Sequence, residues 1–155
     1  MDNQFNFKQS DPRAFGMGVL FRASKERFPV LQGLAIQGLK LKTEAIREPH
    51  VHPNAHQLDY CVAGEAIVGI VEPGGKTKEL HLKPGDISFV PQGYLHWIKN
   101  VAKPELEFLV VLSHEEPETL ELSEMLTGVP SKDLRHMYGV KEEEIHKIRI
   151  PGVIY

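Results

Sequence analysis

The chain has 155 residues, of which 41% are hydrophobic, and its 18 basic residues nearly balance its 21 acidic residues. This length suits one domain with its own core, and the charge balance gives no surplus that would attract nucleic acid or an anionic membrane. No apolar run approaches the ~20 residues of a membrane span, and the first residues lack the pattern of a signal peptide. The single cysteine, Cys61, excludes an intrachain disulfide and suits a reducing compartment, so we expect a cytoplasmic protein. The charge balance and the lack of a membrane span predict no nucleic-acid or membrane partner.

After a polar leader that ends near Pro12, short segments rich in strand-forming residues alternate with turn signals for about a hundred residues. The expected strands cover residues 19–21, 34–41, 58–62, 66–71, 87–90, 96–98 and 106–112. Within the second segment the apolar residues change parity at Gly38, which predicts a bulge or a bend there. Many short strands separated by regular turns predict an all-β sandwich or closed barrel.

The hydrophobic spacing becomes helical from about Thr119. A first helix presents one apolar face, formed by Leu122, Met125, Leu126 and Val129. Ser131 is the expected N-cap of a second helix that Gly139 ends, and residues 141–148 suit a third. These helices lack the apolar surface to fold alone, so we expect them to dock on the barrel or on a neighbouring subunit.

Three histidines form the most informative pattern in the chain. His50 and His52 are separated by one residue, so their side chains point the same way only on a β-strand. His96 begins a different expected strand, directly after a Pro-x-Gly turn. Three imidazoles brought together in this way hold a transition metal and leave coordination positions open.

The segments around these histidines resemble the two motifs of the cupin superfamily. The second motif, Gly-x5-Pro-x-Gly-x2-His-x3-Asn, matches at every defined position: Gly85, Pro91, Gly93, His96 and Asn100. The first motif, Gly-x5-His-x-His-x3,4-Glu-x6-Gly, matches at His50, His52 and Gly64 and departs at Glu44 and Gln57. The resemblance implies one cupin domain over residues 1–155. It would be a double-stranded β-helix, or jelly-roll, barrel from about 16 to 113, with a short C-terminal helical segment at about 119–148.

Residues 47–60 are also similar to the oxalate decarboxylase branch of that superfamily, whose members decarboxylate oxalate with manganese. Arg47 stands where those enzymes carry the arginine that holds the substrate carboxylate, although an arginine at a barrel rim is often simply solvated. Glu116 is the nearest match to their proton-donating lid glutamate, in a Glu-rich stretch that also suits a solvated loop. Val110 replaces a pocket glutamate of the carboxy-terminal lobe.

Gln57 occupies the position of the fourth ligand, where the motif has glutamate. A glutamine binds a metal only through its neutral carbonyl oxygen, which favours anionic ligands and shifts the preference from manganese toward zinc, nickel, iron or copper. Alternatively, Gln57 only forms hydrogen bonds, and the site has three histidines. A shorter spacer would make His56 the ligand, but the spacing to Gly64 favours Gln57 and turns His56 toward the surface.

These residues predict a metal-dependent enzyme that resembles oxalate decarboxylase and acts on a small carboxylate. One divalent transition metal (Mn, Zn, Ni, Fe or Cu) would be held by His50, His52, Gln57 and His96. Arg47 would bind an anionic group of the substrate, and Glu116 would shuttle a proton. The alternatives are a non-catalytic module that binds a small molecule or metal, and a Lewis-acid isomerase or cyclase.

The expected assembly is a homodimer. Single cupin barrels usually pair, and here the leader and the C-terminal helices carry apolar residues that one small barrel leaves uncovered: Phe5, Phe7, Leu122, Met125 and Leu126.

Overall fold

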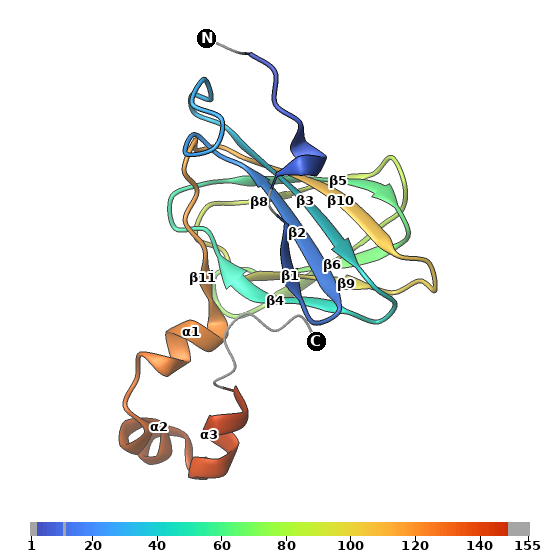
Figure 1. Ribbon diagram of the computed structural model, residues 1–155. Helices are drawn as coiled ribbons and strands as arrows, with labels where there is room; N and C mark the ends of the chain where they lie inside the picture. Colours follow the sequence, from blue (N-terminus) through green and yellow to red (C-terminus); the bar gives the residue numbers. More distant parts are fainter. Residues whose placement is uncertain (1–2, 11, 149–155) are drawn as a thin grey trace.

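The computed structural model describes residues 3–10 and 12–148 and forms a jelly-roll barrel of two antiparallel sheets (Figure 1). The first sheet has the order β1-β2-β3-β10-β5-β8, with the bounds Arg13–Phe15, Gly18–Ala23, Ala35–Leu41, Leu106–Leu112, Gln57–Ala63 and Ile87–Val90. The second has the order β11-β4-β9-β6-β7, with the bounds Leu120–Glu121, Ile46–Val51, His96–Asn100, Ala66–Val71 and Thr77–Leu82. The expected all-β barrel is confirmed.

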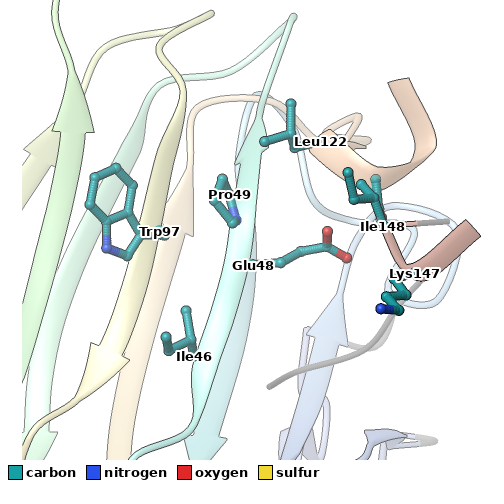
Figure 2. A pocket seen from close by; sticks show the side chains of 8 residues that line it. Ile46, Glu48, Pro49, Trp97, Leu122, Lys147 and Ile148 are labelled. Carbon is teal, nitrogen blue, oxygen red and sulfur yellow. The ribbon is translucent and has the colours of Figure 1, made fainter. Parts of the chain in front are cut away.

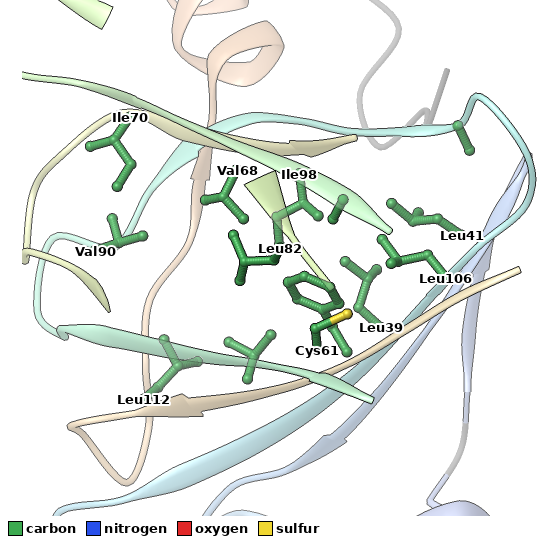
Figure 3. Close-up of a cluster of buried hydrophobic side chains, with 14 of the residues drawn as sticks. Leu39, Leu41, Cys61, Val68, Ile70, Leu82, Val90, Ile98, Leu106 and Leu112 are labelled. Atoms are coloured by element: carbon green, nitrogen blue, oxygen red, sulfur yellow. The ribbon is translucent and has the colours of Figure 1, made fainter. Parts of the chain in front are cut away.

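The hydrophobic core fills the space between the two sheets (Figure 3). Strand β10 shows how it forms, because buried and partly exposed residues alternate along its whole length. Its buried positions are Leu106, Phe108, Val110 and Leu112. Cys61 lies in the same core with no exposed surface, and burial raises the pKa of its thiol. Its place there fits a small hydrophobic side chain rather than a redox group.

The observed strands differ from the expected ones in several places, and β1 and β11, of three and two residues, were not expected because they are too short to show a periodic pattern. Strand β7, Thr77–Leu82, was not expected, because it lies at a sheet edge and only Leu82 is buried, which leaves no alternating apolar pattern. Of the bulge or bend predicted at Gly38, the bulge is wrong, since β3 pairs in unbroken register with both β2 and β10. Gly38 instead faces outward beneath the leader, where a Cβ atom would lie 2.9 Å from the ring of Phe7.

Three helices follow the barrel and lie together beyond its β4–β11 side (Figure 1): α1 (Leu122–Thr127), α2 (Ser131–Tyr138) and α3 (Glu142–Ile148). Helix α1 begins with a capping box between Glu121 and Glu124. Pro130, rather than Ser131, is the N-cap of α2, and Gly139 ends that helix with φ 67°, as expected. Among the described residues, no helix has the length and apolar character needed to cross a membrane.

The leader packs against its own barrel. It includes a short 3-10 helix, η1 (Phe7–Gln9). Phe5 stacks on Phe28 with ring centroids 5.3 Å apart, and the ring of Phe7 lies 6.2 Å from that of Phe21. Phe7 therefore covers the first sheet of its own protomer, and Phe5 packs on the loop between β2 and β3.

Candidate metal centre

The three histidines converge inside the barrel from the second sheet. His50 on β4 is paired directly with His96 at the start of β9, and His52 follows the end of β4. One ligand atom from each imidazole can be chosen so that all three lie within 4.8 Å of one another. All three side chains are buried, with at most 3% of their surface exposed. The structure thus brings together the three residues that the sequence motif singled out.

A bulge in β4 places Arg47 close to these histidines. Residues three apart on a regular strand face opposite sides, yet Arg47 and His50 are both buried. The register between β4 and β9 shifts between these two residues. Because the extra residue resets the alternation, both side chains are directed into the barrel.

The hydrogen bonds of the imidazoles define their tautomers. Each Nδ1 atom lies next to a main-chain carbonyl oxygen: 2.7 Å from Glu48 for His50, 2.7 Å from Glu118 for His52, and 2.9 Å from Tyr94 for His96. A carbonyl oxygen only accepts hydrogen bonds, so each Nδ1 carries the proton. The Nε2 atoms are left with free lone pairs, as a metal ligand requires.

Gln57, the first residue of β5, completes the cluster from the opposite sheet. Its Nε2 donates to Oδ1 of Asp59 at 2.8 Å, which turns its Oε1 toward the histidines. That oxygen lies 2.9 Å from Nε2 of His52 and 3.1 Å from Nε2 of His96. Three electron-pair donors then face one another without a proton between them, and a cation relieves this repulsion. The donor set therefore fits a divalent metal ion.

Burial sets the protonation of the site. It lowers the pKa of His52, lowers that of His96 to about 3, and, together with the charge of Arg47, lowers that of His50 well below the usual value. All three imidazoles are consequently neutral at physiological pH, as metal binding requires. Burial also raises the pKa of Asp59 to about 6, although hydrogen bonds from Ser88 and Gln57 oppose this effect.

Arg47 forms an internal ion pair that sequence reasoning did not anticipate. Its Nη1 lies 2.7 Å from Oε2 of Glu121, its Nη2 lies 2.5 Å from Oε1, and both residues are 8% exposed. The pair lines a polar cavity of about 480 Å³ together with Gln37 and Arg22. Glu121 lies on β11, a strand of only two residues that pairs with β4 opposite His50. So short a strand gives no periodic signal in the sequence.

Glu116 has other partners. Its carboxylate accepts a hydrogen bond from the main-chain nitrogen of Glu26 and lies 3.7 Å from Nη2 of Arg22. The surrounding segment reaches the cluster instead through the carbonyl of Glu118 and the hydroxyl of Thr119, which lies 3.2 Å from Nδ1 of His52.

His56 and Val110 lie outside the cluster as well. His56 is exposed, stacks on Phe89 at 5.5 Å between ring centroids, and accepts a hydrogen bond from the main-chain nitrogen of Gln92. Val110 belongs to the hydrophobic core, directly opposite Asp59 in the pairing of β10 with β5.

Comparisons with known proteins agree with this architecture. The family model for cupins matches residues 5–146. Probable germin-like protein subfamily 2 member 5 of Arabidopsis thaliana is 29% identical over 135 residues, which are 85% of this chain. Oxalate decarboxylase OxdC of Bacillus subtilis is 24% identical over 126 residues, 81% of this chain. A structure of the Bacillus subtilis enzyme, from work on its Mn(II) centres, superposes with a TM-score of 0.88 and 27% identity over 97% of this chain.

The relatives are longer than this chain. The match spans 63% of the germin-like protein and 33% of OxdC, and the superposed region is 41% of the solved oxalate decarboxylase chain. The chain thus corresponds to less than half of an oxalate decarboxylase.

Proposed function

The chain belongs to the cupin family, and from that premise we propose that it is a metal-dependent enzyme that acts on a small carboxylate. The observation that carries the proposal is the convergence of the three histidines, whose ligand atoms lie within 4.8 Å of one another, on Oε1 of Gln57, which contacts Nε2 of His52 and His96, with each Nδ1 next to a main-chain carbonyl. Such an arrangement leaves coordination positions free for a ligand.

His50, His52, His96 and Gln57 would hold the ion. When bound, a divalent metal acts as a Lewis acid toward a carboxylate or carbonyl oxygen of the substrate. The neutral amide of Gln57 favours zinc, nickel, iron or copper over manganese, because an anionic oxygen would suit a harder ion better.

Arg47 and Glu121 would control how a carboxylate enters. Glu121 takes one N–H from each terminal nitrogen of Arg47, so a substrate carboxylate would either bind the remaining N–H groups of the guanidinium or replace Glu121. If the substrate is oxalate, cleavage of its carbon–carbon bond releases CO2, and the remaining carbon takes a proton to give formate. Glu116 would supply that proton after its segment moves inward from Arg22.

Metal analysis of the purified protein tests this proposal. We expect near-stoichiometric transition metal in the wild-type protein and loss of at least nine-tenths of it in His50→Ala and His52→Ala. His81→Ala, an exposed residue on β7, is the matched control and should keep its metal. Assays of the loaded protein with oxalate and related small carboxylates then test turnover. Metal-free wild-type protein from metal-supplemented cultures would contradict the proposal.

The Arg47–Glu121 pair also favours a second candidate, a non-catalytic cupin that binds a small molecule or metal. With Arg47 engaged and Val110 in the core, the structure offers few charged groups for decarboxylation near the histidines. A Lewis-acid isomerase or cyclase would need fewer such groups. Thermal-shift screening followed by turnover assays on each hit separates the enzymes from the non-catalytic cupin. Saturable binding of a small molecule without any product would identify the non-catalytic protein.

For the assembly we propose a homodimer in the cytoplasm, where the buried Cys61 remains a free thiol. The surface that supports it is the outer face of β5 and the edge strand β8. Leu58 is paired with Phe89 and Tyr60 with Ile87 across these strands. The large apolar residues on this face are 38–64% exposed: Leu58, Tyr60, Val62, Ile87 and Phe89. A contiguous apolar patch of this kind usually marks an interface.

The oligomeric state tests this surface. Ile87→Lys should convert the dimer to a monomer in sedimentation velocity, because it places a charge in the centre of the patch. Thr77→Lys, on the edge strand of the other sheet, is the control and should leave the dimer intact. A wild-type monomer at micromolar concentration would contradict the proposal.

A further inference from the structure

A groove of about 590 Å³ lies on the outer side of β4 and β9, across the sheet from the histidines (Figure 2). The alternation along β9 separates the two sites, because His96 is directed inward and Trp97 outward. The walls of the groove are mainly apolar and come from four elements: Ile46 and Pro49 on β4, Trp97 on β9, Leu122 on α1 and Ile148 on α3, with Lys147 of α3 beside them.

Two polar side chains in this groove lack partners. Glu48 and Ser123 both line it and are each 5% exposed. Among the described residues, Oε1 of Glu48 and Oγ of Ser123 have no hydrogen-bond partner. Figure 2 shows the Glu48 carboxylate extending from β4 toward Lys147 and Ile148 of α3. Buried polar atoms are nearly always paired in folded proteins, so these two indicate a missing donor.

The aromatic wall depends on a glycine in the neighbouring strand. Trp97 is paired with Gly69 of β6, and a Cβ atom at Gly69 would overlap the indole ring. The missing side chain lets the indole lie against the sheet, where it forms a flat apolar surface. Because Trp97 is the one tryptophan in the chain, its fluorescence reports on this groove alone.

We propose that the groove binds a small organic amine. Its protonated amino group donates hydrogen bonds to the Glu48 carboxylate and the Ser123 hydroxyl, and its hydrocarbon part packs against Trp97. An ammonium group has three donors and matches a buried carboxylate in charge. The volume is that of a small-molecule site, and the apolar walls with a few convergent polar atoms are typical of one. Lys147 also lines the groove, but Oε1 of Glu48 has no partner among the described residues, so an anionic probe tests which of the two charges sets the selectivity.

Titration of the metal-loaded protein with hexylamine, followed by Trp97 emission, tests this site. Hexan-1-ol and hexanoate, which share the hydrocarbon chain, are the matched probes. We expect a saturable change with hexylamine at concentrations at least tenfold lower than with hexan-1-ol, and no saturation with hexanoate. Glu48→Gln should weaken hexylamine binding at least tenfold and leave the response to hexan-1-ol unchanged. Glu79→Gln, an exposed position on β7, should behave as the wild type.

Ser123→Ala provides a second variant if Glu48→Gln does not fold, and it should weaken hexylamine binding about threefold to tenfold through the loss of one hydrogen bond. Equal responses to the three probes in the wild-type protein would overturn the proposal, because selection by the carboxylate would be absent. So would a wild-type protein whose Trp97 emission shows no saturation with hexylamine.

Discussion

The two faces of the β4–β9 strand pair differ in how their polar groups are satisfied. On the inner face, Arg47 is paired with Glu121, and His50 and His96 each bind a main-chain carbonyl. On the outer face, Glu48 keeps an unpartnered oxygen among the described residues. The inner face is thus preorganised before any metal binds, whereas the outer face still needs a donor.

The largest expected effect comes from breaking the inner ion pair. Glu121→Ala leaves a buried guanidinium without a partner and should lower the free energy of unfolding by about 3–5 kcal/mol. Glu48→Gln on the outer face is the comparison, because Oε1 of this buried side chain has no hydrogen-bond partner to lose among the described residues. It should change that free energy by less than about 1 kcal/mol in either direction. Urea unfolding of both variants measures the difference. Equal losses of unfolding free energy would contradict the proposed difference in side-chain pairing between the two faces.

The pKa values of the inner face predict loss of stability in acid. His50, His52 and His96 have lowered pKa values in the folded state, so the unfolded chain takes up protons first as the pH falls below about 6.5. Burial raises the pKa of Asp59 to about 6, so the folded state takes up this proton before the unfolded chain does. This one carboxyl group therefore offsets part of the loss of stability caused by the three histidines.

The metal-free protein should therefore lose roughly 1–3 kcal/mol of unfolding free energy per pH unit between about pH 6.5 and pH 5. Urea unfolding at several pH values measures this slope, and His96→Gln should reduce it. Stability that stays constant or rises in acid would show that these histidines are not held neutral.

On the outer face, Gly69→Ala should move the indole of Trp97. The added methyl group overlaps the ring, which can tilt into the groove, so we expect a cost of about 1–3 kcal/mol in unfolding free energy. The emission of Trp97 should shift while metal content stays unchanged, because the histidines lie across the sheet. A matched loss of metal would show that the two faces are coupled.

The smallest effect concerns metal selectivity. Gln57→Glu should raise the affinity for manganese relative to zinc about tenfold, or ~1.4 kcal/mol, because an anionic oxygen suits the harder ion. Competition between the two metals, with Gln92→Glu as a control in an exposed loop, measures the ratio. An unchanged ratio would indicate that Gln57 does not coordinate.

The sequence predicted the barrel and the histidine cluster because both depend on short-range patterns. Strands 87–90 and 106–112 have the expected bounds, and the motif spacing brought His50, His52 and His96 together correctly. Strand β7 lacks an apolar face, so no alternation revealed it.

Contacts between distant residues could not be predicted in this way. The partner of Arg47 is 74 residues away on a two-residue strand. The groove combines side chains of β4 and β9 with those of helices whose docking no local pattern specifies. The apparent parity change at Gly38 arises because the polar Gln37 occupies a buried inward position beside Arg47, whereas the apolar Ile36 lies on the other face of β3.

Anomalous diffraction from crystals of the metal-loaded protein tests the central claim most directly. One peak is expected inside the barrel, about 2.0–2.2 Å from Nε2 of His50, His52 and His96 and at a similar distance from Oε1 of Gln57. Each Nδ1 should keep its main-chain carbonyl partner. A peak elsewhere on the protein, or an ion bound through Nδ1 atoms, would contradict the account.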